Sequence, residues 1–262
     1  MKAHFFGREW NQHLVGRGAI EPAGQVERDG QSIYFVNVDT MSRQVTNAQI
    51  DDYQGLPRQR FLWRPPLVLT VHARFSHPPG SLSGTAGFGF WNDPFMMTGL
   101  RLPTLPRAIW FFYASPPSDM RLALDVPGRD WKAATVDALR LPFFLLAPFA
   151  PLAMLLVNLR PLYRALWPRY QRSMGVREAA VDVDMTGWHT YVIEWGNQES
   201  QFLVDGEAVL KNAPSPRGPL GFVLWLDNQY LVATPWGRFR YGWLGAPGRQ
   251  WMEVDDLKIK EG

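Results

Sequence analysis

The segment Leu67–Phe75 alternates between two kinds of position along its whole length. Every second residue, beginning with Leu67, is apolar, and the positions between carry one valine and three polar side chains. This two-residue period is typical of a strand that buries one face in an antiparallel sheet and leaves the other face to solvent. Pro65 and Pro66 directly precede the segment and mark where the strand begins. The segment therefore predicts a half-buried antiparallel strand.

Short segments of similar character follow one another along most of the chain. Further strands are expected at 32–38, 85–91, 108–114, 120–126, 179–185, 188–195, 201–204, 207–210, 219–227 and 250–260. Asp205 and Gly206 separate two of these segments and predict a tight hairpin turn. Strands do not alternate with helices, which disfavours a parallel sheet. We expect one all-β domain over residues 1–262, an antiparallel jelly-roll sandwich with a mostly helical insertion at 138–177.

The insertion differs in character from the rest of the chain. It contains six arginines and no acidic residue, and residues 141–157 form a nearly unbroken apolar run. Three prolines interrupt this run, and both ends of the insertion return to the sandwich, so a membrane-spanning helix is disfavoured. We expect a bent helical hairpin with Pro161 in the first turn of its second helix. Apolar residues recur in that helix at helical spacing and predict a basic amphipathic helix.

The distribution of charge limits the classes of partner. The chain has 27 basic and 24 acidic residues, so removing the six arginines of the insertion leaves 21 basic residues against 24 acidic ones. A basic excess confined to one segment disfavours a general nucleic-acid-binding domain and favours an anionic lipid or ligand at the insertion. The lack of cysteine excludes disulfides and thiolate metal sites. No apolar signal segment is visible near Met1, so we expect a cytoplasmic protein, with membrane association left open.

Several aromatic motifs occur in a distinctive order. They are 87–91 (GFGFW), 188–195 (WHTYVIEW), 202–206 (FLVDG), 224–228 (LWLDN) and 250–255 (QWMEVD). In this order the motifs resemble the concanavalin A-like lectin/glucanase superfamily, and specifically the laminarinase-like proteins of glycoside hydrolase family 16. The resemblance implies a sandwich fold with a cleft along one sheet and a glycan as ligand.

The chain departs from that family at the strand that carries the family's catalysis. Family 16 enzymes use a Glu-x-Asp-x-x-Glu strand, because a retaining mechanism needs two carboxylates roughly 5 Å apart. The segment that falls at this place, 107–113 (RAIWFFY), has no carboxylate. We therefore expect no two-carboxylate glycoside hydrolysis, and the sequence leaves open whether the protein is an enzyme at all.

Candidate ligand-binding residues lie on the strands and strand ends that would border such a cleft. The residues around Trp110 line the cleft or fill the core, and those after Trp91 form a rim site or a turn before Pro94. The residues after Trp225 end a strand that borders the cleft in the related family. The complete set is Trp91, Asn92, Asp93, Trp110, Phe112, Tyr113, His189, Trp225, Asp227, Asn228 and Tyr230.

Two groups of polar residues are candidates for chemistry. His189 is an acid–base candidate by residue type, but Glu194 lies five positions away on the opposite face of its strand, so the two form no dyad. Asp182 and Asp184 share a strand face, yet two carboxylates are too few ligands for calcium, and a solvated face is the better interpretation. We predict no metal site and no cofactor.

The apolar insertion and the apolar segment 107–113 suggest one function together. The favoured hypothesis is a sandwich protein that binds a hydrophobic or amphipathic small molecule in an aromatic cleft beneath the insertion. The covering side chains would be Phe143, Phe144, Phe149, Leu155, Tyr163 and Trp167. Two alternatives stay open: a carbohydrate-binding or glycan-active protein, and a module that contacts a membrane surface or forms a homodimer through the insertion.

Overall fold

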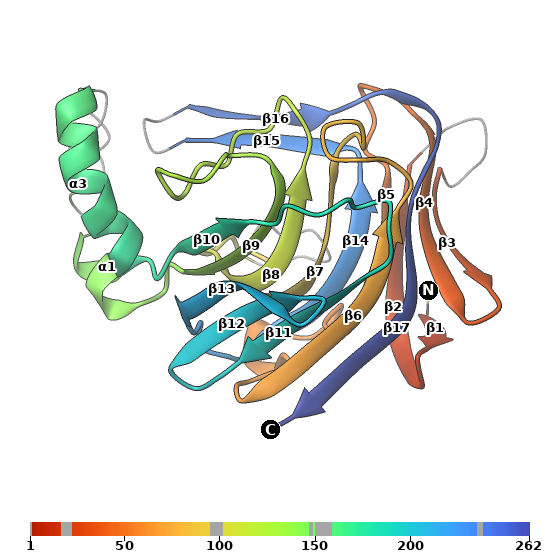
Figure 1. Cartoon of the computed structure of the whole chain (residues 1–262), viewed down its shortest axis with the longest axis horizontal. Coiled ribbons are helices and arrows are strands. Elements are labelled where there is room, and N and C mark those ends of the chain that lie inside the picture. Colours follow the sequence, from red (N-terminus) through yellow and green to blue (C-terminus); the bar gives the residue numbers. More distant parts are fainter. Residues whose placement is uncertain (1, 17–22, 95–101, 147–148, 150–158, 235–237) are drawn as a thin grey trace.

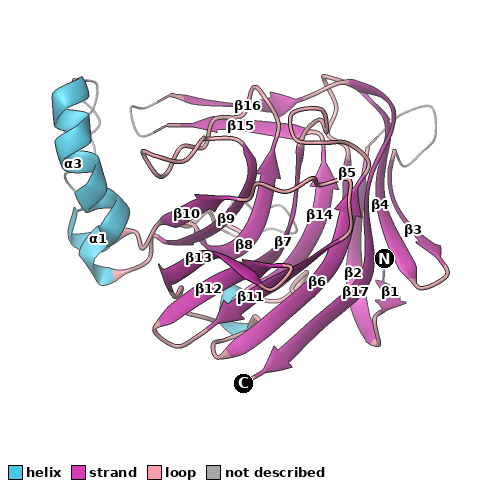
Figure 2. Cartoon of the chain, in the orientation of Figure 1, coloured by secondary structure: helices cyan, strands magenta, loops and turns pink. Residues whose placement is uncertain are grey.

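Two antiparallel sheets form the body of the protein (Figures 1 and 2). The computed structural model describes residues 2–16, 23–94, 102–146, 149, 159–234 and 238–262. Sheet A has the order β1 (Lys2–Phe5), β2 (Arg8–Val15), β5 (Asn47–Asp51), β14 (Gly221–Asp227), β7 (Thr85–Trp91), β8 (Arg107–Ala114), β9 (Asp130–Asp137), β10 (Arg177–Ala180). Sheet B has the order β13 (Glu207–Pro214), β12 (Glu199–Val204), β11 (His189–Trp195), β6 (Leu67–Phe75), β17 (Ala246–Glu261), β4 (Ser32–Thr40), β3 (Gly24–Asp29). A separate hairpin joins β15 (Gln229–Ala233) to β16 (Phe239–Trp243).

The core lies between the two sheets and is rich in aromatic rings. The alternating apolar residues of β6 are all buried, as their period predicted. Phe111 of sheet A packs its ring on Trp131 and Tyr191, with ring centroids 5.9 and 5.1 Å away. Full burial of a side chain such as Phe111 contributes roughly 1.5–3 kcal/mol to stability. The two sheets are therefore held together mainly by the apolar side chains that their strands direct into the core.

The predicted all-β antiparallel sandwich is confirmed, and many of the predicted strands occur at or near their expected places. The bounds of β6 and β7 agree with the predicted segments, and β8 begins one residue earlier. The turn between β12 and β13 has φ angles of 52° at Asp205 and 84° at Gly206. Both angles are positive, as a two-residue hairpin turn of the primed type requires.

Three expectations about secondary structure were wrong. Residues 120–126 form no strand, and β10 ends at Ala180 instead of continuing to Met185. The expected shared strand face of Asp182 and Asp184 therefore does not exist, and Asp184 instead accepts hydrogen bonds from the backbone N–H and hydroxyl of Thr186. Strand β9 and the β15–β16 hairpin were not anticipated. Strands β9 and β15 show no clean apolar alternation, and the aromatic alternation of β16 spans only five residues.

The described part of the insertion contains two helices. They are α1 (Leu141–Leu146) and α3 (Arg160–Ser173), and Pro161 occupies the first turn of α3 as expected. Figure 1 shows both helices projecting beyond the edge of sheet A at β10. Most of the apolar run, including residues 147–148 and 150–158, lies outside the described residues. None of the described helices combines the length and the apolar character that crossing a bilayer requires.

The loop between β8 and β9, residues 115–128, is anchored by a buried ion pair. Lys132 Nζ lies 2.8 Å from Glu178 Oε1, and each of the two side chains is 2% exposed. Glu178 Oε2 also accepts a hydrogen bond from the backbone N–H of Ala123, and Lys132 Nζ donates to the carbonyl oxygen of Met120. The pair therefore ties the 115–128 loop to strands β9 and β10.

We predict that the variant Lys132→Met is strongly destabilised, because it leaves the carboxylate of Glu178 buried without its counter-charge. Removing one partner of a buried pair costs about 3–5 kcal/mol of unfolding free energy. Urea denaturation measures the loss. The double variant Lys132→Met/Glu178→Gln should recover most of it, because the amide oxygen can still accept the Ala123 hydrogen bond. A single variant within about 1 kcal/mol of the wild type would contradict the anchoring role.

Candidate functional site

The outer face of sheet A, turned away from sheet B, carries a second cluster of apolar side chains. Alternation along β8 sends Ile109 and Phe111 to the core and sends Trp110 and Phe112 to the outer cluster. Strand pairing then sets the rows that cross this face. Phe112 pairs with Gly87, and Gly87 pairs with Trp225 on the next strand. The central strands of sheet A are thus apolar on both faces.

Four rings on this face form a continuous group, which we call the aromatic platform: Trp91, Trp110, Phe112 and Trp225. The centroid of Trp110 lies 5.4 Å from that of Phe112, 5.7 Å from that of Trp225 and 5.9 Å from that of Trp91. Trp225 and Trp91 are only 7% and 9% exposed, whereas Trp110 and Phe112 are half-buried. Trp110 and Phe112 therefore present the accessible surface of the platform.

Two glycines of β7 make room for the platform. A Cβ atom on Gly87 would lie 2.8 Å from Cη2 of Trp225 and 2.3 Å from the carbonyl oxygen of Phe111. A Cβ atom on Gly89, which has a φ of 152°, would lie 2.6 Å from Cβ of Trp110. The glycines that alternate with aromatic residues in 85–91 thus mark a close backbone approach. Trp225 and Trp110 can meet only because β7 has no side chain between them.

We predict that Gly87→Ala displaces Trp225 and lowers stability by about 1–3 kcal/mol, the usual cost of overpacking a filled site. Gly187→Ala is the matched control, because a Cβ atom there would lie 3.4 Å from its nearest neighbour, an ordinary contact. Urea denaturation of both variants measures the difference. Equal stabilities for the two variants would show that β7 does not need a side-chain-free position beneath Trp225.

Hydrogen bonds fix the orientation of two indoles of the platform. Trp225 Nε1 donates to Thr85 Oγ1 at 2.9 Å, and Trp91 Nε1 donates to the hydroxyl of Tyr53 at 2.6 Å. Thr85 in turn donates its hydroxyl to Asp227 at 2.8 Å. The rings are therefore held in place by polar contacts at their edges, which leaves their flat faces free to pack or stack.

Asp227 lies at one end of the platform and is buried. Burial raises the pKa of its carboxyl to about 6, although hydrogen bonds from Gln229 and Thr85 favour the ionised form. In the unfolded chain the pKa of this group is 3.8. The folded protein therefore holds a proton on Asp227 in a range of pH where the unfolded chain has released it.

This difference predicts a pH-dependent stability. Between about pH 4 and pH 6 the folded state binds more protons at Asp227, so the unfolding free energy falls as pH rises through this range. The difference between the two pKa values corresponds to about 3 kcal/mol of unfolding free energy. Relative to the wild type, Asp227→Asn should gain about that amount between pH 4 and pH 7, measured by urea denaturation at each pH. A stability difference that does not change with pH would contradict the enclosed, proton-holding carboxyl.

Polar side chains flank the platform on strands β2 and β5. Asp51 accepts hydrogen bonds from Asn11 Nδ2 and Gln49 Nε2, and from the backbone N–H of Tyr53. His13 pairs with Gln49 in the same row as Trp225. Burial raises the pKa of Asp51 and lowers the pKa of His13, and the carboxylate of Asp51 partly offsets the shift at His13. Asn11 and His13 are half-buried, so polar groups remain accessible beside the aromatic rings.

Sequence reasoning missed this polar group. Its members lie on 11–13 (NQH) and 47–51 (NAQID), and alternation in those two segments is the signal that could have found them. Within the described part of the chain, the imidazole of His13 has no hydrogen-bond partner. It is therefore available to a ligand on the outer face of sheet A.

The structure separates the predicted site residues into two sets. Trp91, Trp110, Phe112, Trp225 and Asp227 lie on the outer face of sheet A, where the prediction placed a cleft. Tyr113 and His189 do not lie there. The side chain of Tyr113 points into the core between the sheets. Its hydroxyl donates a hydrogen bond to the carbonyl oxygen of Leu82. Adjacent residues on a strand face opposite sides, so Phe112 and Tyr113 could not both line the cleft.

His189 is a structural residue of sheet B. Its Nδ1 lies 2.6 Å from Asp205 Oδ2, and its Nε2 lies 2.9 Å from the carbonyl oxygen of Asp184. The sequence analysis considered only Glu194 as an acidic partner and overlooked Asp205, which the β12–β13 hairpin brings back beside β11. Both ring nitrogens are occupied, and the residue is on the sheet opposite the platform.

The remaining polar candidates are engaged in turns and strand ends. Asn228 Nδ2 donates to the carbonyl oxygens of Gln44 and Leu244, and its Oδ1 accepts from the N–H of Thr46. Asn92 Oδ1 accepts from the N–H of Arg107. Asp93 is buried with a φ of 45°, and its carbonyl oxygen accepts from Arg58 Nη2. Tyr230 is half-buried on the β15–β16 hairpin, where its ring covers Gly242.

The expected lid residues are only partly described. Leu155 and the side chains of Phe144 and Tyr163 lie outside the described part of the structure. Phe149 is exposed, and Phe143 is half-buried. Trp167 is half-buried and donates its Nε1–H to the carbonyl oxygen of Leu122, which attaches α3 to the 115–128 loop. Among the described residues, this hydrogen bond at Trp167 holds α3 beside the 115–128 loop.

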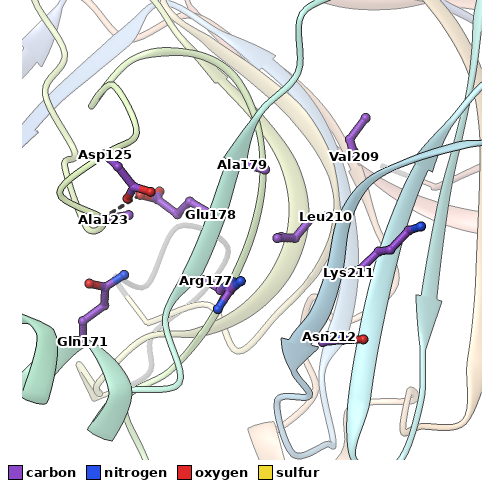
Figure 3. A pocket seen from close by; sticks show the side chains of 10 residues that line it. All are labelled: Ala123, Asp125, Gln171, Arg177, Glu178, Ala179, Val209, Leu210, Lys211 and Asn212. Atoms are coloured by element: carbon purple, nitrogen blue, oxygen red, sulfur yellow. Dashed lines mark hydrogen bonds between the residues drawn. The ribbon is translucent and has the colours of Figure 1, made fainter.

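A pocket of about 560 Å³ lies at the open edge of the sandwich, between β10 and β13 (Figure 3). Asp125 and Glu178 approach each other on its loop side, and Gln171 of α3 and Arg177 of β10 lie on its other side. Glu178 is already neutralised by Lys132, and Figure 3 shows Lys211 pointing away from Leu210 and the other lining residues. The pocket shares no side chain with the aromatic platform, and the described residues include no group of three metal-binding side chains.

Comparisons with known proteins reveal the architecture of the chain. No protein-family model and no curated protein sequence matches it. One similar solved structure comes from work on endo-acting O-glycanases of the human gut microbiota, which initiate mucin breakdown. The match covers 97% of this chain and 92% of that chain, with a TM-score of 0.51 and 13% identity. The GlcNAcα1-4Gal-releasing endo-β-galactosidase from Clostridium perfringens matches 95% of this chain and 57% of its own, with a TM-score of 0.50 and 13% identity.

A laminarinase from Flavobacterium sp. UMI-01 matches 96% of this chain and 93% of its own, with a TM-score of 0.46 and 12% identity. The chain has a concanavalin A-like sandwich fold. The resemblance predicted from the motifs is thereby confirmed at the level of the fold, over nearly the whole chain. At such low identity, the shared fold specifies no activity, which has to be argued from the site itself.

Proposed function

We propose that the protein binds an extended carbohydrate chain on the outer face of sheet A, by stacking sugar rings on the accessible parts of the aromatic platform. The observation that carries this proposal is the pair of half-buried rings, Trp110 and Phe112, on β8. The resemblance implies that this strand corresponds to the one on which family 16 hydrolases carry their acidic residues. The proposed activity is recognition of a glycan without two-carboxylate hydrolysis.

The size and polarity of the face fit a carbohydrate. From His13 on β2 to Phe112 on β8 there are four strand spacings of about 4.8 Å, roughly 19 Å, which suits several sugar units rather than one. Flat aromatic faces suit the C–H faces of sugar rings, and the amide of Asn11 and the imidazole of His13 can bond hydroxyl groups. The site thus combines stacking with a small number of polar contacts, as ligand sites commonly do.

The carboxylates near the platform do not offer the acid and nucleophile of a retaining hydrolase. Such an enzyme needs two carboxyl groups about 5–5.5 Å apart on either side of the scissile bond. Asp51 accepts bonds from Asn11, Gln49 and backbone N–H groups, and Asp227 accepts bonds from Thr85 and Gln229. Both carboxyls are buried and engaged with protein donors, so neither is placed to attack or protonate a bound sugar.

The hypothesis of a hydrophobic ligand beneath a helical lid has less support. It depended on the insertion covering the platform, whereas α1 and α3 project beyond the β10 edge (Figure 1). Two similar solved structures with TM-scores of at least 0.50 are an endo-β-galactosidase and a protein from work on O-glycanases, which favours a glycan as the ligand class.

Screening on a glycan array, followed by calorimetry on the best ligand, tests the proposal. Trp110→Ala and Phe112→Ala should each weaken binding at least tenfold, which corresponds to about 1.4 kcal/mol. Trp188→Ala is the matched control, because this half-buried tryptophan stacks on His72 at the outer face of sheet B, with ring centroids 4.7 Å apart. It should leave binding unchanged. The absence of any glycan ligand, or equal effects of all three substitutions, would refute the proposal.

A further inference from the structure

An exposed row of aromatic side chains lies on β16. Phe239 and Tyr241 are 66% and 68% exposed, and Trp243 continues the row on the same face of the strand. Ring centroids along the row are 6.2 and 6.4 Å apart, and the rings are tilted at 54° and 87° to each other. Both tilts are larger than those between neighbouring rings of the aromatic platform, which range from 26° to 50°. Large exposed rings at every second position of one strand indicate an interaction surface.

The insertion carries a second group of exposed apolar side chains. Leu141 begins α1 and is 71% exposed, Phe149 is 60% exposed, and Leu159 and Leu162 at the start of α3 are also exposed. The hairpin and the insertion are far apart in the sequence. Figure 1 shows both extending toward the same end of the long axis of the molecule.

The 115–128 loop physically connects these two segments. Trp167 of α3 donates to the carbonyl oxygen of Leu122 at 2.9 Å. Three residues earlier, the backbone of Asp119 bonds β15 twice, through its N–H to Leu231 and through its carbonyl oxygen to the N–H of Ala233. Because three residues of chain span at most about 11 Å, α3 and β15 are held close to one another.

Both segments carry arginines and contain no acidic residue. Residues 138–177 contain six arginines and no acidic residue, and residues 228–245 contain two arginines and no acidic residue. Arg164 on α3 and Arg240 on β16 are exposed. Within the described residues, neither of these two guanidinium groups has an ion-pair partner. Exposed arginines interleaved with aromatic and aliphatic side chains match the composition of surfaces that lie at a lipid interface.

We propose that the end of the molecule formed by β16, α1 and α3 docks on an anionic membrane surface. The rings of Phe239 and Tyr241 and the exposed side chains of Leu141, Leu159 and Leu162 enter the headgroup region, and Arg164 and Arg240 bind lipid phosphates. Self-association through this surface is disfavoured, because an isologous contact would bring arginines against arginines with no acidic residue to pair them. The proposal is independent of the glycan site on sheet A.

Vesicle sedimentation with the full chain tests the proposal. The protein should bind vesicles made of equal parts phosphatidylglycerol and phosphatidylcholine, should bind phosphatidylcholine vesicles at least tenfold more weakly, and should be released by added salt. Phe239→Ala/Tyr241→Ala and Arg164→Glu/Arg240→Glu should each reduce the binding at least tenfold. All substituted side chains are exposed or unpaired, and circular dichroism verifies that the variants are folded.

Two control variants match these changes elsewhere. Arg28→Glu reverses an exposed charge on β3, at the opposite side of the molecule in Figure 1. Leu62→Ala removes an exposed apolar side chain beside Trp63. The backbone of Trp63 pairs with Leu220, just before the start of β14, whereas β15 follows the other end of that strand. Both should bind vesicles as the wild type does. Failure of the wild type to bind anionic vesicles would overturn the proposal. So would vesicle binding that all four variants retain, or a solution dimer that Phe239→Ala/Tyr241→Ala dissociates.

Discussion

The central strands of sheet A bury side chains on both of their faces, and the rest of the structure depends on this constraint. Phe88 and Phe111 fill the core, while Trp110 and Trp225 pack on the outer face. The two indoles can pack there only because β7 has no side chain at Gly87 and Gly89. The same residues therefore hold the sandwich together and create the flat surface proposed to bind glycan. Stability and recognition are built on one set of strands.

A second constraint acts at the rim of that surface. The buried pair of Lys132 and Glu178 fixes the 115–128 loop, and this loop contacts α3 through Leu122 and β15 through Asp119. Leu122 also packs against the outer cluster that contains the platform. One buried ion pair thus positions the edge of the platform and both segments of the proposed membrane surface. An ion pair of this kind specifies an arrangement more than it adds net stability.

Strict periods and turn chemistry were sufficient to predict the sandwich from the sequence. The alternation in Leu67–Phe75, the Asp205–Gly206 turn and the glycine-aromatic segment 85–91 each have one structural interpretation, and the structure agrees with it. The β15–β16 hairpin escaped because β15 shows no apolar alternation and the aromatic alternation of β16 spans only five residues. The partners of His189 and the polar residues beside Trp225 depend on which strands become neighbours, and local periodicity does not contain that information.

The central claim is that the aromatic platform of sheet A holds a carbohydrate. A crystal structure of the protein with a bound oligosaccharide tests it most directly. The account predicts a sugar ring stacked on Trp110 or Phe112, with hydroxyl groups directed toward Asn11 and His13 on β2. An oligosaccharide bound elsewhere, with the platform covered only by the protein's own side chains, would contradict it.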